Sequence, residues 1–386
     1  MKSNKIRLGE QCVVTSSKRF HLSERITQGV PFYCSKEIIK KFNGEDVTEC
    51  DYISEDLYKK VSNEVGVPKE NDLLITTRGT IGIPYLYKRT DRFYFADGNL
   101  TWIKDFDSNL YSKFLYYWFQ SYEGRKKFEA LAKGTAQKAV PISGIKTLEI
   151  ELPSLKSQKR IADILSAYDD LIENNQKQIK LLEEAAQRLY KEWFVDLRFP
   201  GHENTEIVDG VPEGWIKEEI GKIIKKVHRT KQIVASEYKD EGSIPIVDQS
   251  RAFVAGYTND LEARVDFGIP IIVFGDHTRI VKLIQFPFAK GADGTQLIIS
   301  DCLEMPQRLL YCSIMNVDLS NYHYARHFKY LKEEKIMIPT VKVANEFENN
   351  VTGIFSKIQN CRDEIIRCQK TRDLLLPKLM SGEVEV

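Results

Sequence analysis

The chain has 386 residues, of which 42% are hydrophobic, and a formal net charge of +1. This length allows two or more domains, and the hydrophobic content is too high for a disordered chain. Because the net charge is close to zero, a nucleic-acid partner would have to be met by local basic surface rather than by the field of the whole molecule.

The first residues lack the apolar stretch of a signal peptide, and no apolar run approaches the ~20 residues that span a bilayer. The 7 cysteines are an odd number and include no C-x-x-C pair, which argues against a structural zinc site. We therefore expect a cytoplasmic protein with reduced thiols and no bound metal.

An internal repeat organises the chain, and each copy predicts the same elements in the same order. The first elements are strand-like runs on either side of a short turn, DLLITTRGTIGIPYLY at 72–87 and IPIIVFGDHTRIVKLI at 269–284. The tripeptide Ala-Asp-Gly follows in both copies, at 96–98 and at 292–294. We therefore expect two globular domains of the same α/β kind.

Each copy continues with a short helix, a short strand ended by a proline, and a long helix. The short helices are expected in KFLYYWF (113–119) and RLLYCSI (308–314), and the prolines are Pro153 and Pro339. Apolar residues then step by four and three positions, which predicts a heptad seam in each long helix. The seam residues are Ile161, Leu165, Ile172, Asn175, Ile179, Leu182 and Leu189 in the first helix, and Phe347, Val351, Ile354, Ile358, Ile365 and Leu375 in the second. The polar member, Asn175, either sets the register of the helices or lies at a frayed or wet position.

Two long helices with matching seams most simply pack on each other, because a lone helix cannot bury its seam. We therefore predict an α+β fold, in which two globular α/β domains are joined by two long antiparallel coiled-coil helices with an internal pseudo-two-fold repeat. The expected parts are a first domain at 1–153, a central helix at 154–197, a second domain at 198–339 that begins with a linker at 198–214, and a C-terminal helix at 340–386.

This layout resembles the specificity subunit of Type I restriction-modification enzymes, and the resemblance covers nearly the whole chain. The stretch LPSLKSQKRIADILSAYDDLIENNQKQIKLLEEAAQRLYKEWF at 152–194 carries much of it. Its signature residues are Pro153, Gln158, Ile161, Ala162 and Leu165. Further motifs similar to those of the family are TTRGTIG (76–82), GTAQKAVP (134–141), GDHTR (275–279) and LLPKLMSGEV (375–384).

The resemblance implies two target-recognition domains, each reading one half of a split sequence in double-stranded DNA. It also implies methyltransferase subunits that bring S-adenosylmethionine and modify adenine at N6, and restriction and translocase subunits that bring ATP and Mg. No cofactor is expected on this chain. The second copy departs from the pattern, because Ala344 stands where the first has Gln158, and YARHFKYL (324–331) replaces the Gly-Thr-x-Gln segment.

Catalytic motifs of such partners are missing from this sequence. It has no Pro-Pro dipeptide, which an adenine methyltransferase uses to grip a flipped base. It also has no P-loop, which an ATP-driven motor needs to hold phosphate. We therefore expect a non-catalytic DNA specificity subunit, with an orphan DNA-binding subunit or a coiled-coil scaffold without active partners as the alternatives.

The turn GDHTR at 275–279 lies between two apolar runs and could either catalyse a reaction or read DNA. Asp276 and His277 are adjacent, so on a strand their side chains would point to opposite faces. No nucleophile or second metal ligand lies close by in the sequence. A carboxylate after a glycine commonly caps a turn, whereas Arg279 can pair with guanine or form a surface ion pair. We expect Asp276 to be structural and the rest of the turn to contact DNA.

Basic and polar side chains in turns and loops are the candidates for DNA contact. Lys and Arg suit phosphates and guanine, Gln suits adenine edges, and aromatic residues among basic ones are typical of nucleic-acid surfaces. In the first domain the candidates are Arg78, Thr80, Lys133, Thr135, Gln137 and Lys138. In the second they are His277, Thr278, Arg279, Lys282, Tyr324 and Arg326. The same residue types also fit an ordinary surface loop or, for the tyrosine, the core.

Three aromatic residues, Trp193, Phe194 and Phe199, lie near the end of the first long helix. They could close the hydrophobic seam, or they could form a docking patch for a methyltransferase subunit, because aromatic anchors commonly carry interface energy. We favour the seam for Trp193, and both alternatives stay open for Phe194.

Overall fold

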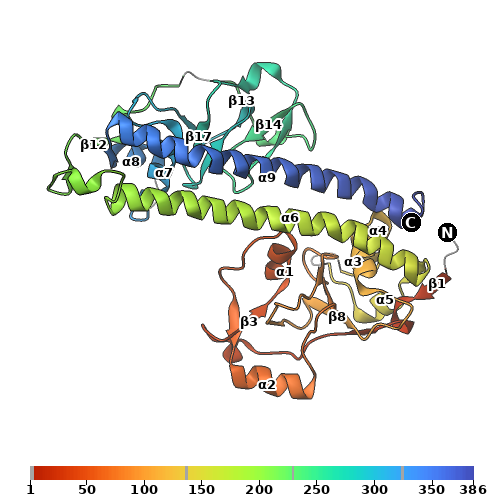
Figure 1. Cartoon of the computed structure of the whole chain (residues 1–386). Helices are drawn as coiled ribbons and strands as arrows, with labels where there is room; N and C mark the ends of the chain where they lie inside the picture. Colours follow the sequence, from red (N-terminus) through yellow and green to blue (C-terminus); the bar gives the residue numbers. More distant parts are fainter. Residues whose placement is uncertain (1–3, 135–137, 228–229, 323–325) are drawn as a thin grey trace. The chain divides into compact units, whose positions relative to one another are not determined.

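The computed structural model describes residues 4–134, 138–227, 230–322 and 326–386 (Figure 1). The chain forms two compact units. Unit 1 comprises Met1–Asn174 and Glu364–Val386, and unit 2 comprises Asn175–Asp363. Each unit contains one α/β domain and a stretch of each of the two long helices.

The domain of unit 1 consists of small, mainly antiparallel sheets and short helices. Its four-stranded sheet has the order β2 (Val13–Thr15), β8 (Leu100–Lys104), β5 (Leu73–Thr76) and β6 (Pro84–Leu86). Its three-stranded sheet has the order β4 (Asp51–Ile53), β3 (Val30–Tyr33) and β7 (Tyr94–Phe95), and β1 (Asn4–Arg7) pairs with β9 (Glu149–Leu152). The helices are α1 (Ser35–Phe42), α2 (Glu55–Glu64), α3 (Ser112–Gln120), α4 (Tyr122–Glu129) and α5 (Ile142–Lys146).

The domain of unit 2 contains a five-stranded and a three-stranded sheet. The larger sheet has the order β13 (Gln232–Ile233), β19 (Phe288–Gly291), β14 (Ile244–Val247) and β15 (Gly256–Thr258), with β16 (Arg264–Val265) also paired to β19. The smaller one has the order β18 (Val281–Ile284), β17 (Ile271–Gly275) and β20 (Thr295–Ile298). Two further pairs are β12 (Ile216–Glu219) with β21 (Lys335–Ile338), and β10 (Ile207–Val208) with β11 (Val211–Pro212). The helices are α7 (Gln307–Met315) and α8 (His327–Glu333).

The repeated hairpins occupy equivalent places in the two domains. Strands β5 and β17 are buried along their whole length, because each is a continuous apolar run with a neighbouring strand on both sides. Each is followed by a turn and an antiparallel partner, β6 or β18. The strand pairs expected at 72–87 and 269–284 are therefore confirmed.

The two long helices run antiparallel within each unit. They are α6 (Leu155–Tyr190), which continues as a π-helical turn at Lys191–Val195, and α9 (Val341–Ser381). In unit 1, Arg372 of α9 donates to the Asp169 carboxylate of α6 at 2.7 Å. In unit 2, Arg362 of α9 donates to Glu183 of α6, also at 2.7 Å. Farther along in unit 2, the rings of Trp193 and Phe347 are 5.7 Å apart. Residue numbers on α9 therefore decrease as the numbers of their partners on α6 increase, which is the pattern of antiparallel helices.

All the expected seam residues are shielded from solvent to some degree. Ile161, Leu165, Ile172, Asn175, Phe347, Val351 and Ile358 are buried, and Ile179, Leu182, Leu189, Ile354, Ile365 and Leu375 are half-buried. Asn175 is only 2% exposed, so it does not lie at a frayed or wet position.

The compact units do not follow the four-part division expected from sequence. Both long helices begin and end close to the expected bounds, but the boundary between units runs through them, at 174/175 in α6 and at 363/364 in α9. The physical reason is that each half of a seam shares its hydrophobic core with the adjacent α/β domain.

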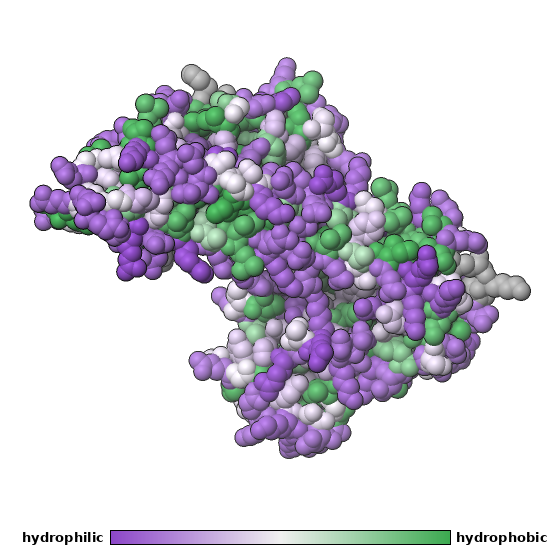
Figure 2. Space-filling view, viewed as in Figure 1, coloured by the Kyte–Doolittle hydropathy of each residue, from purple (hydrophilic) through white to green (hydrophobic). Residues whose placement is uncertain are grey.

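The surface carries few large apolar areas on the face shown in Figure 2, where hydrophilic residues are interspersed with smaller hydrophobic patches. The most exposed apolar side chains, among them Leu22, Leu261 and Leu303, are scattered through the sequence. Isolated exposed apolar residues of this kind are normal in folded proteins. Among the described residues, no helix combines the length and the hydropathy needed to cross a membrane.

A buried amide ties the start of α6 to the domain of unit 1. Gln158 is only 1% exposed, and its Oε1 accepts a hydrogen bond from the N–H of Tyr111 at 2.9 Å. Its Nε2 donates to the carbonyl oxygens of Asn109 and Pro153 at 2.8 and 3.0 Å. The signature glutamine therefore caps the segment that leads into α3.

In unit 2, a different residue ties the start of α9 to the α/β domain. Ala344, which replaces the glutamine, is fully buried. One helical turn later, the Glu348 carboxylate accepts hydrogen bonds from the Arg308 guanidinium at 2.9 Å and from the Leu309 N–H at 3.3 Å, at the start of α7. The polar anchor has moved by one turn of α9, which explains the departure from the signature without loss of the attachment.

Replacing Gln158 with Ala is expected to destabilise unit 1. The substitution leaves the Tyr111 N–H and two carbonyl groups without their partner, and a buried unsatisfied group costs about 1–3 kcal/mol. We expect the free energy of unfolding to fall by about 2 kcal/mol, measured by urea unfolding of the full chain. Lys159→Ala, on the exposed side of the same helix, is the matched control. An equal loss in the two variants would contradict the anchoring role.

Candidate nucleic-acid interface

The turn after β17 is held in a defined shape by its backbone. The Gly275 N–H donates to the Ile280 carbonyl and the Arg279 N–H donates to the Gly275 carbonyl, both at 2.8 Å. Arg279 has a φ of 60°, a left-handed conformation that is uncommon for a residue with a side chain. The turn therefore projects from the buried strand with a fixed geometry.

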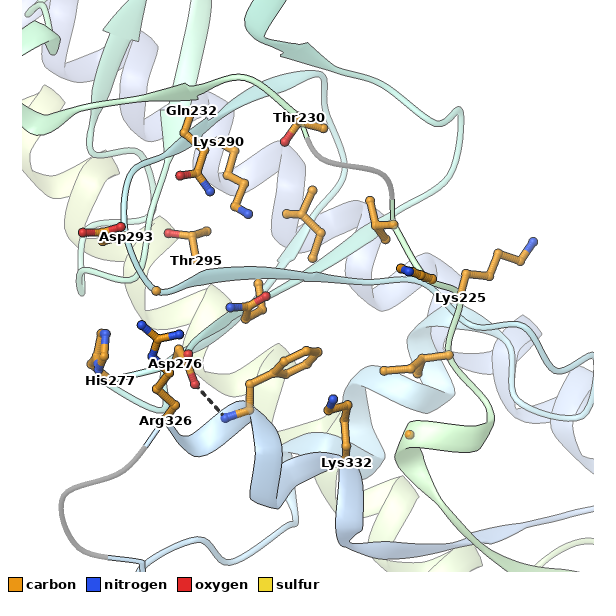
Figure 3. Close-up of a pocket in the computed structure, with 18 residues that line it drawn as sticks. Lys225, Thr230, Gln232, Asp276, His277, Lys290, Asp293, Thr295, Arg326 and Lys332 are labelled. Atoms are coloured by element: carbon orange, nitrogen blue, oxygen red, sulfur yellow. Dashed lines mark hydrogen bonds between the residues drawn. The ribbon is translucent and has the colours of Figure 1, made fainter.

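Asp276 connects this turn to two other segments of unit 2. Its N–H donates to the Gly294 carbonyl at 2.6 Å, and its carbonyl accepts the His327 N–H at 2.9 Å. Its carboxylate accepts the Phe328 N–H at 2.8 Å, in the first turn of α8 (Figure 3). The structural role expected for Asp276 is confirmed, although the carboxylate caps α8 rather than its own turn.

The turn after β5 in unit 1 is attached in the same way. The Thr77 N–H donates to the Asn99 carbonyl, which follows the first Ala-Asp-Gly, and the Thr77 carbonyl accepts the Val140 N–H, both at 2.9 Å. These bonds match those of Asp276 with Gly294 and His327. The two domains thus hold the same turn against the same two neighbours.

This arrangement brings several unit 1 candidates together. Arg78 forms an isolated β-bridge with Ala139, and Ala139 is paired with Lys133 through backbone hydrogen bonds of 2.9 and 3.0 Å. Arg78, Thr80, Lys133 and Lys138 are all exposed. Thr135 and Gln137 lie outside the described residues, as does Tyr324 in unit 2.

A basic groove with a volume of about 1070 Å³ lies beside the turn of unit 2 (Figure 3). The cationic residues that line it come from separate segments, and they are Lys225, Lys226, Lys290, Arg326 and Lys332. The acidic ones are Asp276 and Asp293. Because cations outnumber carboxylates in a concave surface, the groove attracts the phosphates of a nucleic acid.

Lys290 is a partly desolvated cation in this groove. It is half-buried on β19, burial lowers the pKa of its ammonium group, and it forms no ion pair within the described part of the chain. A bound phosphate would offset that desolvation. Gln232 lies opposite Lys290 in the parallel pair of β13 and β19, so the two side chains emerge next to each other.

The candidates of unit 2 do not all face this groove. His277 and Arg326 line it. Thr278 and Arg279 are exposed beside it, but the Thr278 hydroxyl donates to the Gln249 carbonyl at 2.7 Å, and the Arg279 guanidinium donates to the Leu319 carbonyl at 3.0 Å. These two side chains therefore support the turn.

Lys282 does not fit the expectation of a DNA contact. Its side chain is 5% exposed, and its ammonium group donates to the carbonyls of Asp248 and Ala252 at 2.8 and 2.5 Å. Burial lowers its pKa to about 8, and the nearby Asp248 carboxylate raises it. This lysine anchors a loop inside the domain, because its strand position points it inward.

Sequence reasoning missed most of the groove. Lys225 and Lys226 belong to a basic run before β13, which begins at Gln232, and this run could have been noticed. Lys290 and Lys332, by contrast, lie singly in an apolar strand and in a helix. No local pattern connects these segments. Among the described residues, no cluster of three His, Cys, Asp or Glu side chains could hold a metal ion.

The aromatic residues after α6 are part of the core of unit 2. Phe194 is 4% exposed, and its ring lies 5.1 Å from that of Phe347 and 5.6 Å from that of Trp215. Trp193 and Phe199 are buried in the same cluster. Phe194 is therefore not available as a docking patch, and all three residues close the seam.

The duplicated α/β domains and the paired helices define a class of recognition protein with an internal repeat. The family model described as "Type I restriction modification DNA specificity domain" matches residues 3–184. The Type I restriction enzyme MjaIX specificity subunit of Methanocaldococcus jannaschii is 30% identical over 303 residues, which are 71% of this chain and 69% of that protein. The chain belongs to the family of Type I restriction enzyme specificity subunits.

A solved structure supports the fold assignment. The S subunit of a Type I restriction-modification system from M. genitalium superposes with a TM-score of 0.60 at 18% identity. The match covers 98% of this chain and 96% of that one. The likeness at this low identity concerns the fold alone.

Replacing Lys332 with Ala is expected to weaken the binding of duplex DNA. Loss of one phosphate contact should reduce the slope of log affinity against log salt concentration by about 0.9. The measurement is a salt titration of the full chain with a duplex of unrelated sequence. Lys357→Ala, which removes an exposed charge from α9 outside the groove, is the control. Identical slopes in both variants would exclude a contact at Lys332.

Replacing Lys282 with Ala is expected to lower the stability of unit 2 without changing the salt dependence of DNA binding. Two buried carbonyls lose their donor, so the free energy of unfolding of unit 2 should fall by about 1–3 kcal/mol. The salt dependence of DNA binding should stay as in the unmodified chain, measured under conditions where the variant is folded. A reduced slope of log affinity against log salt concentration, without a loss of stability, would indicate that Lys282 contacts DNA.

Proposed function

We propose that the chain reads a bipartite DNA target, with one half-site read by each unit. The observation that carries this proposal is the repeated attachment of the turn after β5 and the turn after β17, through Thr77 with Val140 and Asp276 with His327. Both turns lie next to exposed basic side chains, although their sequences differ. A shared framework with different side chains is what two related domains need to read two different half-sites.

The basic groove of unit 2 offers two kinds of contact. Lys225, Lys290 and Lys332 provide the charge that phosphates require, independent of sequence. Gln232, His277 and Arg326 add hydrogen-bonding groups that can read base edges, because Gln pairs with adenine and Arg with guanine in the major groove. Phosphate contacts position the domain, and base contacts supply specificity.

The surface of unit 1 provides the same chemistry from fewer described residues. Arg78 and Lys133 meet at Ala139, and Lys138 is adjacent in sequence. Gly79 has a φ of 75° and no atom within 4 Å of the place where a Cβ would be, so the turn is open to an approaching backbone. This surface is the counterpart of the basic groove for the other half-site.

The chain itself takes no part in catalysis in this proposal. The Asp276 carboxylate is engaged by the Phe328 N–H, so it does not form an acid-base pair with His277. Methyltransferase subunits would supply S-adenosylmethionine and methylate adenine at N6, and restriction subunits would supply ATP and Mg. The relatives are specificity subunits by name, and that similarity supports this division of labour. The cytoplasm, where thiols such as those of the free cysteines stay reduced, is the proposed location.

The test is a genome-wide map of N6-methyladenine in the source cells, with and without the gene. Deletion should abolish methylation at one split motif with a constant gap, because both half-sites depend on this chain. Re-expression of the unmodified gene should restore it. An unchanged map in the deletion strain would favour an orphan DNA-binding subunit or a coiled-coil scaffold.

A further inference from the structure

Asp293 is an exposed carboxylate in the otherwise mainly cationic groove of unit 2. It lies in the turn between β19 and β20 with a φ of 36°, three residues after Lys290 (Figure 3). Within the described part of the chain, its carboxylate takes part in no ion pair or side-chain hydrogen bond. None of the described side chains pairs with this charge.

The turn that carries Asp293 is held in place from several directions. Gln249 donates through Nε2 to the Asp293 carbonyl at 3.0 Å and accepts the His277 N–H on Oε1 at 3.1 Å. The Asp276 N–H donates to the Gly294 carbonyl at 2.6 Å. Both turns that border the groove are thus locked to each other, which presents Asp293 and His277 in a fixed geometry.

Gly294 makes this close approach possible. Its φ is +70°, and an added Cβ would lie 2.7 Å from Cδ2 of His277 and 2.8 Å from Nε2 of Gln249. A side chain at this position would be strained by the positive φ and would displace the ends of the His277 and Gln249 side chains. The two turns are therefore positioned by contacts within the domain.

Unit 1 uses the corresponding aspartate differently. Asp97, in the other Ala-Asp-Gly tripeptide, accepts the Ser16 hydroxyl at 2.7 Å and the Arg19 Nε–H at 3.1 Å. Both carboxylate oxygens of Asp97 are therefore engaged. Among the described residues, the aspartate of this tripeptide is therefore engaged in unit 1 and has no side-chain partner in unit 2.

A free carboxylate opposes the binding of DNA unless it finds a donor. It repels phosphates, and this repulsion lowers affinity for every sequence alike. Exocyclic amino groups are the donors that bases expose in the major groove, N4 of cytosine and N6 of adenine. A carboxylate flanked by cations can reach such a group while Lys290 and Arg326 attract the phosphates.

We propose that Asp293 is a specificity-determining residue of unit 2, an inference that rests on the proposed function. Its carboxylate accepts a hydrogen bond from the exocyclic amino group of a cytosine or adenine in the second half-site. Gln249 is a positioning residue, since it holds the backbone of Asp293 and of His277.

The experiment measures the affinity of the complex of this chain with its methyltransferase subunits. The DNA probes are the mapped target and a set in which each base pair of the second half-site is replaced in turn. The unmodified complex should discriminate against replacement of one pair that presents an amino group by roughly tenfold or more. Asp293→Ala should lose that discrimination and keep it at the other positions. The identity of that pair distinguishes cytosine from adenine.

Two further variants separate base reading from folding and from charge. Asp293→Asn keeps the turn, because asparagine also adopts left-handed conformations, and it keeps an acceptor oxygen, so it should retain part of the discrimination. Asp240→Asn changes the net charge equally at an exposed site that does not line the groove, and should retain all of it.

Three outcomes would overturn the proposal. Asp293→Ala could keep full discrimination at every position, it could raise affinity evenly for all sequences, or it could weaken discrimination at all positions alike. Failure of the proposed function would look different, because the unmodified complex would then show no discrimination at any base pair.

Discussion

Burial of the apolar seams of α6 and α9 is the constraint on which the rest of the structure depends. An amphipathic helix of this length cannot keep its apolar stripe in water. In unit 1, Ile161 and Leu165 bury theirs in one core with Phe114 of the domain, and in unit 2, Phe347 and Val351 share a core with residues of α7. Each α/β domain thereby shares a hydrophobic core with the long helices. Each compact unit consists of one such domain and the adjacent stretches of α6 and α9.

Buried and half-buried polar groups make the attachment specific. Gln158 and Glu348 hold the starts of α3 and α7 against the long helices, and Lys282 and Asp276 hold loops within the domain of unit 2. Their hydrogen bonds offset part of the cost of burial, while Nε of Arg308, the partner of Glu348, is buried without a hydrogen-bond partner among the described residues. Side chains that the fold engages in this way are not free to contact a ligand.

The repeat, the two hairpins and the long helices could be predicted, because hydrophobic periodicity and proline positions act locally. The structural role of Asp276 was also within reach, since a carboxylate after glycine favours capping. The prediction for Lys282 was wrong, because a lysine near a turn normally reaches water, and here the loop at 248–252 covers it. Phe194 could not be assigned from sequence, as the same aromatic residue suits a core or an interface.

The sequence by itself determined the family, the order of the elements and the register of the seams, because these depend on spacing within single segments. Only the tertiary structure decided which charged side chains share a surface. Lys225, Lys290 and Lys332 meet in one groove because a loop, a strand and a helix converge there, although more than a hundred residues separate the first from the last. Burial and proximity arise from contacts between distant segments, and no local pattern records them.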